Sequence, residues 1–511
     1  MSYFSHPMHF RFFALLVVFL PSLLWGQNDL LRYKEEVFPS FTKTTNVLYS
    51  SNDPVPRYNI LLYWFSGNKY KIVDDEAPSN LTTTSLRYNL YQPAGDTIQK
   101  RPAIVLCFGG GFVAGEKEYW SMNLLAEGLA KRGFVVAAID YRLGMFISDS
   151  IYSARAVYRG VQDSYAAISH LRANATNLRI DPDRVFIGGH SAGAFIAIHN
   201  LYMDDDPTER PLGTYTYDDA LNQGGLLATS EHPGFNGRAN GGFALAGAIG
   251  NPSYINSGDI GIALFHSTDD PTVNIGYEVP FKEYENFGLE LPKTHGSDLI
   301  EDRFQSLNIP YQYDRYTNRG HDVHENGTTA LHADILPKIS SWLMVNHLKP
   351  TTIPFEGGFE VCSSSPTAFY QAQNSGMYSH HWSVIGGTII SGQGSPLVEI
   401  NWDTLATNHS LSYTPITYNH AAGDSLALDI NVANSFSNTW ASMTSGSWDE
   451  AGRWSKGRIP LGCDEVSFDA NITIPQSVTI GENQQVVIKS LSLPENYEVI
   501  ISSGATLQLK P

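Results

Sequence analysis

The sequence predicts an α/β protein with a mostly parallel, doubly wound sheet, followed by smaller all-β modules. Short apolar runs are typical of buried strands, and the run that ends at His190 passes directly into a helical pattern. After a Pro- and Thr-containing linker at residues 349–354, the composition changes to Ser, Thr, Asn and Gly with short alternating strands. The 511 residues are enough for two to four domains and a large core.

The N-terminus predicts a signal peptide over residues 1–26. A weakly basic start precedes the apolar stretch 12–24, which is too short to span a bilayer comfortably. Gly26 and Gln27 indicate cleavage after Gly26, and an uncleaved anchor is the alternative. Residues 27–80 then form an N-terminal extension with strand-like pieces such as Ile60–Phe65.

The first chemical motif is a glycine run after an apolar strand at residues 102–108. Gly109, Gly110 and Gly111 let the backbone approach a substrate closely and aim N–H groups at one point. Such donors are needed where an oxyanion forms as a serine attacks a carbonyl. Gly110 and Gly111 are therefore candidate oxyanion-hole donors, and a plain glycine-rich turn is the alternative.

The second motif is Gly-x-Ser-x-Gly at residues 189–193, between a buried strand and a helix that runs to about Tyr202. In this context the serine occupies a strained strand-to-helix turn that exposes its hydroxyl at the top of the sheet. The motif alone is weak in a glycine-rich chain, but the strand-turn-helix context strengthens it. Ser191 is the candidate nucleophile, and the N–H of Ala192 is a further oxyanion donor.

Two later strands are followed by residues that complete a Ser, Asp, His chain order. The strand at 260–265 precedes Asp269 and Asp270, of which Asp270 is the candidate acid; an Asp-Pro turn with solvated carboxylates is the alternative. The strand at 311–316 precedes His321, the candidate base, with His324 as the second choice.

With these motifs, residues 80–348 resemble the α/β-hydrolase superfamily, and within it secreted carboxylesterases with a Gly-Gly-Gly-Phe oxyanion loop. The segment Asp140–Leu143 and the helix and turn at 163–184 support the resemblance, whereas Phe108 stands where such enzymes usually carry His. The resemblance implies that His321 takes the Ser191 proton while Asp270 holds the imidazole. It implies no cofactor and no metal.

The remainder of this body, residues 27–348 in all, contains two long connections. A polar, cap-like insertion at 204–242 carries Tyr215, Tyr217 and Phe235, with Phe243 directly after it, and we expect it to shape the acyl or alcohol pocket. A loop at 277–309 is expected to complete the rim. The amphipathic stretch 328–348 predicts the closing helix.

Two β-rich modules follow. Residues 355–436 resemble the PKD-like, Ig-like β-sandwiches of exported bacterial enzymes, with Trp382 expected in the core. Residues 437–511 resemble the start of a β-solenoid surface module, in which Trp448 and Trp454 are core rather than carbohydrate-binding residues. We expect both modules to act as spacers or attachments to a cell surface or polymer.

The three cysteines cannot form a disulfide framework. Cys107 is expected to be a buried, inert thiol, and a bridge between Cys362 and Cys463 is possible but not favoured because they fall in different modules. No His or Cys cluster has metal-ligand spacing, and a solvated loop is a better explanation of Asp204–Asp206 than a calcium site.

A net charge of −18 with no basic cluster excludes a nucleic-acid partner. The sequence therefore predicts a bacterial serine carboxylic-ester hydrolase, secreted or at the cell surface. It would act through an acyl-enzyme on acylated polysaccharide or small esters. The alternatives are an inactive adhesion protein on a hydrolase scaffold and a prolyl-oligopeptidase-type peptidase. The peptidase is disfavoured because no propeller-like repeat precedes the body.

Overall fold

The computed structural model describes residues 29–55, 82–145, 150–205, 225–282, 290–325, 331–351, 353–373 and 376–510. The chain forms two compact units, one of residues 1–349 with 417–422 and one of residues 350–416 with 423–511. The predicted signal peptide and the strand at Ile60–Phe65 lie outside the described residues. Within the described ranges, no helix is long and apolar enough to cross a membrane.

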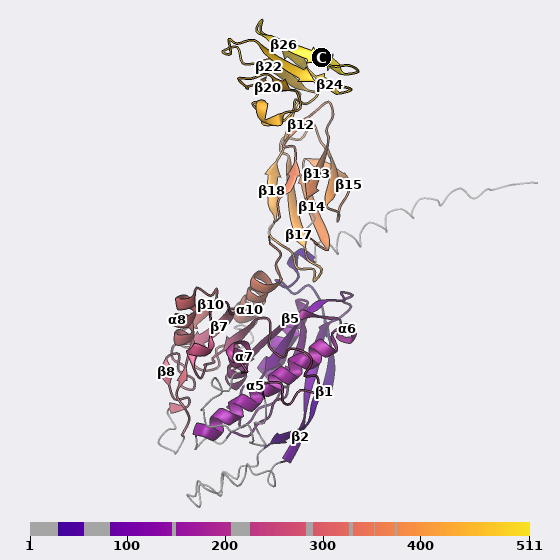
Figure 1. Ribbon diagram of the computed structural model, residues 1–511. Helices are drawn as coiled ribbons and strands as arrows, with labels where there is room; N and C mark the ends of the chain where they lie inside the picture. The colour runs from indigo at the N-terminus through magenta and orange to yellow at the C-terminus, as the bar shows by residue number, and fades with distance from the viewer. Residues whose placement is uncertain are drawn as a thin grey trace, which may run out of the picture. The chain divides into compact units, whose positions relative to one another are not determined.

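The first unit is built on an eight-stranded sheet in the order β1-β2-β4-β3-β5-β6-β7-β10 (Figure 1). Strands β1 and β2 pair antiparallel with their neighbours, and the other six strands run parallel. This arrangement confirms the predicted α/β-hydrolase fold class. The strands are β1 (Phe41–Val55), β2 (Thr82–Pro93), β3 (Arg101–Cys107), β4 (Val135–Ile139), β5 (Ile180–His190), β6 (Gly242–Leu245), β7 (Ile262–Ser267) and β10 (Gln312–Tyr316).

Helices cover the sheet, and α5 is seen crossing one face of it in Figure 1. Helix α5 packs on α7, which contacts β5 and β6, whereas α4 packs on β4 and α10. Strands β3 and β4 are buried along their whole length, as expected for parallel strands covered on both faces. The helices are α4 (Trp120–Lys131), α5 (Ser150–Ala173), α6 (Ala175–Leu178), α7 (Ala192–Tyr202), α8 (Ser297–Leu307) and α10 (Leu336–Leu343).

Two helices differ from the sequence expectation. Helix α5 begins at Ser150, so the segment at 163–173 is only its last part. The closing helix is not uniform: α10 is flanked by π-helical turns at Leu331–Ile335 and Met344–Leu348. Apolar periodicity alone does not distinguish an α-turn from a wider π-turn, because both bury the same face.

The loop after β4 is fixed by a buried ion pair. The Nε atom of Arg142 donates to Asp163 Oδ1 on α5 at 2.8 Å, and the Arg142 backbone N–H donates to Asp163 Oδ2 at 2.7 Å. Both side chains are fully buried. Because each charge is paired and hydrogen-bonded, the pair holds this loop at the carboxyl edge of the sheet, next to the glycine run.

The second unit begins with two antiparallel sheets packed around a tryptophan-rich core. One sheet has the order β11-β13-β16-β15 and the other β14-β17-β18, while β12 pairs with β19 in parallel. Trp382 is buried in the core with Trp402, as expected for the first module. The strands are β11 (Phe355–Gly357), β12 (Glu360–Cys362), β13 (Thr367–Ala372), β14 (Ser379–Ile385), β15 (Gly387–Ser391), β16 (Leu397–Trp402), β17 (Ser410–Ile416), β18 (Leu426–Asp429) and β19 (Asn431–Ala433).

The rest of the unit consists of short strands stacked in parallel, in the orders β20-β22-β25, β21-β23-β26 and β24-β27. Trp440, Trp448 and Trp454 are buried together in its core, so Trp448 and Trp454 do not present faces to a carbohydrate. The strands are β20 (Phe436–Trp440), β21 (Gly446–Ser447), β22 (Asp464–Phe468), β23 (Gln476–Ile480), β24 (Gln485–Ile488), β25 (Ser490–Ser492), β26 (Tyr497–Ile501) and β27 (Thr506–Leu509).

Cys362 and Cys463 form a disulfide across 101 residues, which is the bridge that the sequence left possible but did not favour. The two modules of this unit meet where β12 ends and β22 begins. Glu360, two residues before Cys362, also pairs with Lys456 at 2.7 Å and Arg458 at 2.6 Å. Sequence separation and module assignment gave no sign of this contact, because it depends on tertiary packing.

Candidate active site

The turn after β5 holds Ser191 in a conformation that few non-glycine residues adopt. Its φ is +52°, and its backbone N–H donates to Leu245 O of β6 at 2.9 Å. A Cβ at Gly189 would lie 2.5 Å from Cys107 O, and one at Gly193 only 2.1 Å from the same atom. The two glycines are therefore required by the close approach of α7 and β3, and the strained serine turn is the one expected of a nucleophile.

Ser191, His321 and Asp270 come together at the carboxyl edge of the sheet. His321 Nε2 lies 2.8 Å from Ser191 Oγ, and His321 Nδ1 lies 2.8 Å from Asp270 Oδ2. A carboxylate accepts only, so Nδ1 carries the proton and Nε2 presents its lone pair to the serine hydroxyl. This is the tautomer that a general base for Ser191 needs.

Asp270 is the most strongly hydrogen-bonded group of the three. Its Oδ1 accepts the N–H groups of Thr272 at 2.8 Å and Val273 at 2.9 Å, while its Oδ2 also lies 3.1 Å from His266 Nε2. Burial alone would raise the pKa of this carboxyl, but the hydrogen bonds from His266 and His321 hold the pKa well below its usual range. Asp270 is therefore ionised wherever the protein is folded at ordinary pH.

The two second-choice residues from the sequence lie elsewhere. Asp269 is exposed and accepts from the Ser267 hydroxyl and, at 3.4 Å, from the Gly320 N–H. His324 is fully buried, with Nε2 at 3.1 Å from Ser121 Oγ. Neither side chain contacts Ser191 or His321 through a hydrogen bond in the described part of the chain.

The glycine run after β3 forms a tight loop. Gly110 O accepts the N–H groups of Val113 and Ala114 at 3.1 Å, and Gly110 and Gly111 both have positive φ. A Cβ at Gly110 would lie 2.0 Å from Ala114 O, so only glycine fits. The N–H groups of Gly110, Gly111 and Ala192 donate to no acceptor among the described residues.

Phe108, which directly precedes the glycine run, has a packing role. Its ring stacks on Tyr141 with centroids 4.3 Å apart, and the Tyr141 hydroxyl donates to Phe108 O at 2.9 Å. Tyr141 follows β4, so this pair fixes the start of the glycine loop to the neighbouring strand. The aromatic residue therefore supports the loop without an imidazole.

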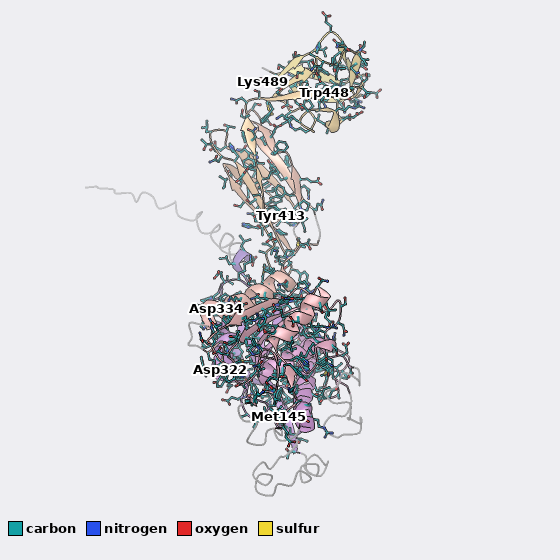
Figure 2. All side chains as sticks on the ribbon, turned by 90° about the vertical axis from the view of Figure 1, so that its left-hand side faces the viewer. Met145, Asp322, Asp334, Tyr413, Trp448 and Lys489 are labelled. Atoms are coloured by element: carbon teal, nitrogen blue, oxygen red, sulfur yellow. A yellow bond between two sulfur atoms is a disulfide. The ribbon has the colours of Figure 1, made fainter. Side chains whose placement is uncertain are left out.

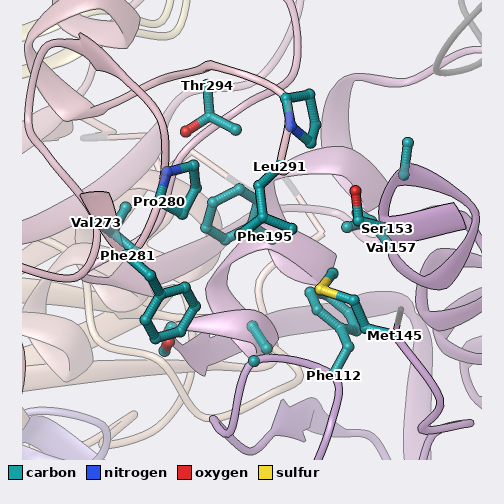
Figure 3. Close-up of a pocket in the computed structure, with 15 residues that line it drawn as sticks. Phe112, Met145, Ser153, Val157, Phe195, Val273, Pro280, Phe281, Leu291 and Thr294 are labelled. Carbon is teal, nitrogen blue, oxygen red and sulfur yellow. The ribbon is translucent and has the colours of Figure 1, made fainter. Parts of the chain in front are cut away.

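An apolar pocket of about 60 Å³ opens beside Ser191 (Figure 3). Figure 3 shows aromatic and aliphatic side chains converging on it, with hardly any polar surface. The lining residues are Gly111, Phe112, Met145, Ser153, Ala154, Val157, Ser191, Ala192, Phe195, Val273, Pro280, Phe281, Leu291, Pro292 and Thr294. Met145 is also labelled in Figure 2.

The pocket is lined by one of the two predicted connections. Pro280, Phe281 and Leu291 come from the loop at 277–309, as expected for the rim. Among described residues, none from 204–242 lines it: Phe235 is exposed, and Phe243, one residue beyond this range, is buried in β6. Tyr215 and Tyr217 lie outside the described residues. The sequence did not identify Met145 or Phe195 as pocket residues, because helix and loop positions reveal their partners only after folding.

Three side chains around His321 bring potential metal-ligand atoms close together, but both ring nitrogens of His321 already take part in hydrogen bonds. Ligand atoms of His190, His321 and Asp322 lie within 4.8 Å of one another, and His190 Nε2 lies 3.3 Å from Asp322 Oδ1. Asp322 is labelled in Figure 2. His321 Nε2 is already engaged with Ser191, and burial holds the pKa of His190 well below its usual value.

Cys107 is a buried free thiol whose pKa is raised by burial, as expected for an inert cysteine.

Comparison with known proteins gives local similarities to esterases. The BD-FAE family matches residues 88–222, a segment that carries the glycine loop and Ser191 but ends before Asp270. The neuroligin-like protein glit-1 of Caenorhabditis elegans is 33% identical over 124 residues, 24% of this chain and 16% of that protein. The probable isoprenylcysteine alpha-carbonyl methylesterase ICMEL1 of Arabidopsis thaliana is 35% identical over 136 residues, 26% of this chain and 25% of that protein.

These alignments span between a sixth and a quarter of the relatives' length. Among solved structures, a propionate-bound esterase from Thermogutta terrifontis is 19% identical, with a TM-score of 0.39. That comparison covers 54% of this chain and 94% of the other.

Proposed function

We propose that this protein is a serine carboxylic-ester hydrolase that acts through an acyl-enzyme. The observation that carries the proposal is the Ser191–His321–Asp270 arrangement. The serine sits at a positive-φ turn, its hydroxyl lies 2.8 Å from a base nitrogen, and a buried carboxylate lies 2.8 Å from the other nitrogen. The local similarity to proteins named as esterases supports the same class of reaction.

In the proposed reaction, Ser191 Oγ attacks the acyl carbon of the ester while its proton passes to His321 Nε2. Asp270 accepts from the Nδ1–H and stabilises the imidazolium. The N–H groups of Gly110, Gly111 and Ala192 donate to the oxyanion. Collapse of the intermediate expels the alcohol, which takes the proton from His321. Water then attacks the acyl-enzyme by the same steps and releases the carboxylic acid.

The pocket supports an apolar, short acyl group. Its lining offers hardly any polar partner, so a polar acyl group would lose its hydration without compensation. A volume of about 60 Å³ holds roughly four to six water-sized groups. Acyl chains of about two to four carbons therefore fit best.

The alcohol side is proposed to accept a saccharide. Tyr119 and Trp120 are both exposed at the start of α4, and the Tyr119 hydroxyl donates at 3.4 Å to Glu325, four residues after His321. Exposed aromatic rings beside a reaction centre offer an apolar surface with polar edges, which suits the carbon face of a sugar ring. Trp120→Ala should raise KM for an acylated saccharide and leave KM for a p-nitrophenyl ester unchanged.

The first experiment is hydrolysis of a p-nitrophenyl ester series from acetyl to decanoyl, with acetylated xylan and methyl ferulate assayed in parallel. We expect kcat/KM to be highest for propionyl or butyryl and to fall for longer chains. Absence of hydrolysis of every ester by a folded protein would reject the proposal. It would leave the alternative of an inactive binding protein on a hydrolase scaffold.

Export through the signal peptide, and a role of the second unit as a spacer or attachment to a surface or polymer, complete the proposal. Retention of the full-length chain on insoluble polysaccharide tests the second point.

A further inference from the structure

The carboxyl group of Asp270 contacts a second histidine besides the base. His266 lies in β7, four residues before Asp270, and its side chain is fully buried. Its Nε2 lies 3.1 Å from Asp270 Oδ2 and 2.8 Å from Val273 O, and its Nδ1 lies 2.8 Å from Ser297 Oγ at the start of α8. A chain of contacts therefore runs from Ser297 through His266, Asp270 and His321 to Ser191.

The partners of His266 decide its tautomer. Val273 O can only accept, so Nε2 must carry a proton, and that N–H is shared between the carbonyl and the carboxylate. Nδ1 is then the lone-pair nitrogen of the neutral ring, and the Ser297 hydroxyl donates to it. The neutral imidazole thus satisfies every partner without burying a second charge.

The Nε2–H group of His266 also completes the set of hydrogen bonds that Asp270 accepts. Two backbone N–H groups occupy Oδ1, and two imidazole N–H groups, from His266 and His321, occupy Oδ2. A carboxylate with donors on both oxygens cannot rotate away from the base. Among the interactions that lower the pKa of Asp270, the hydrogen bond from His266 has a larger effect than the hydrogen bond from His321.

We propose that His266 is a positioning residue for the esterase reaction: its Nε2–H fixes Asp270 against His321 and tunes how strongly the carboxylate holds the imidazolium. This inference rests on the proposed function of Ser191, His321 and Asp270. His266 does not touch the reacting atoms and acts through Asp270.

The sign of the effect follows from the hydrogen bond. A donor on Oδ2 stabilises the carboxylate and shares its charge, so removing the donor makes Asp270 more basic. A more basic Asp270 binds the imidazolium form of His321 more strongly, which moves the low-pH limb of kcat/KM to higher pH. Besides Asp270, the titratable groups that face His321 in the described part of the chain are His190, Asp322, His324 and Glu325, and these stay the same in every variant.

The test compares His266→Leu, which has no donor, with His266→Gln, whose amide can return an N–H near the Nε2 position. For His266→Leu we expect the midpoint of the low-pH limb of the kcat/KM profile to shift to higher pH by roughly half to one unit. We also expect kcat/KM at its plateau to fall roughly tenfold, the size expected for one lost hydrogen bond to a charged group. His266→Gln should recover most of both effects. Ser297→Ala, which weakens the donor only indirectly, should shift the limb in the same direction by less.

A merely structural role of His266 would lower activity at all pH values without moving the limb, and that result in folded His266→Leu would overturn the inference. If His266→Leu does not fold, an unmoved limb in Ser297→Ala would overturn it.

The second measurement follows the His321 ring by NMR titration in a Ser191→Ala background, with and without His266→Leu. An upward shift there supports the His266 contact even if no ester is hydrolysed, so the failure of each proposal is seen separately. An unchanged titration would reject the positioning role.

Discussion

The first unit contains two serine–histidine pairs. In one pair the histidine accepts a hydrogen bond from the serine, and in the other the histidine donates one to it. His321 Nε2 faces Ser191 at 2.8 Å, and His324 Nε2 faces Ser121 at 3.1 Å. In the first pair the Nδ1–H is bound to Asp270, so Nε2 accepts from the serine. In the second pair the Ser121 hydroxyl donates to Glu325 at 2.7 Å, so His324 Nε2 donates to the serine.

The difference shows that the third partner decides what a serine–histidine pair can do. A carboxylate that accepts from the histidine Nδ1–H leaves the Nε2 lone pair free to accept the serine proton. A carboxylate that accepts from the serine hydroxyl instead already holds the hydrogen bond that a base would need. Burial strengthens the contrast, since it lowers the pKa of His324 to about 3, with His321 nearby adding to the effect. The second pair joins α4 to the loop that carries the proposed base, so we assign it a structural role.

The sharpest test of this comparison is Ser191→Ala against Ser121→Ala. Loss of Ser191 removes the proposed nucleophile, and kcat should fall by roughly three decades or more. Loss of Ser121 removes a buried hydroxyl that links two side chains, which should cost about 1–3 kcal/mol of stability and leave kcat within a few-fold. Ester hydrolysis and thermal melts measure both, and a tenth of normal activity in Ser191→Ala would remove that residue from the mechanism.

The histidines provide the next comparison. His321→Ala should reduce kcat by roughly three decades, because no base remains for Ser191. His324→Ala should leave Ser191, His321 and Asp270 in place and lower the melting temperature, because it opens a cavity and removes the N–H that donates to the Ser121 oxygen. Steady-state kinetics at several pH values would show the contrast. If His324→Ala were the more severe change in a protein that still folds, the assignment of the two pairs would be reversed.

The two aspartates sharpen the role of the third partner. Asp270→Asn should lower kcat by roughly two to four decades, since an amide no longer selects the Nδ1–H tautomer. Asp269→Asn should have a mild effect because its exposed carboxylate contacts the Ser267 hydroxyl and the backbone at Arg319 and Gly320, and accepts no hydrogen bond from His321 among the described residues. Equal losses in both variants would indicate that loop geometry, and not the tautomer, limits the rate.

The smallest expected effect concerns stability in acid. His324 stays neutral in the folded protein down to about pH 3, whereas in the unfolded chain its pKa is about 6.5, so the unfolded state gains a proton first as pH falls. The contribution of the neutral, buried His324 ring to the free energy of unfolding is thus complete above about pH 6.5. It is lost progressively as the pH falls toward 3. His324→Gln should show a shallower decline of melting temperature over this range.

His332→Gln, at a half-buried position, is the matched control and should follow the unmodified protein. His170, His199 and His347 have pKa values lowered to about 4 by burial, so part of the acid sensitivity remains in every variant. A His324→Gln profile parallel to the unmodified one would contradict the assignment of a neutral, buried ring.

Much of the first unit follows from local sequence. The apolar runs before Ser191 and Asp270 predict β5 and β7 within a few residues, because parallel strands covered on both faces are largely apolar. The alternating pattern before His321 predicts β10, an edge strand that is only partly buried. The glycines at 189 and 193 follow from a turn in which any Cβ would collide with the Cys107 backbone. Since these strands end at one edge of the sheet, their chain order was enough to bring the three candidate residues together.

What the sequence determined by itself was therefore the α/β framework and the identity of the residues at its carboxyl edge, because both depend on short-range pattern and chain order. Tertiary structure alone decided the rest. It separated Asp270 from Asp269 and His321 from His324 by burial and by partners distant in the chain. It also placed His266 behind the acid, lined the pocket with Met145 and Phe195, and joined Cys362 to Cys463. These contacts have no local signature, since each forms only when surfaces far apart in sequence are packed together.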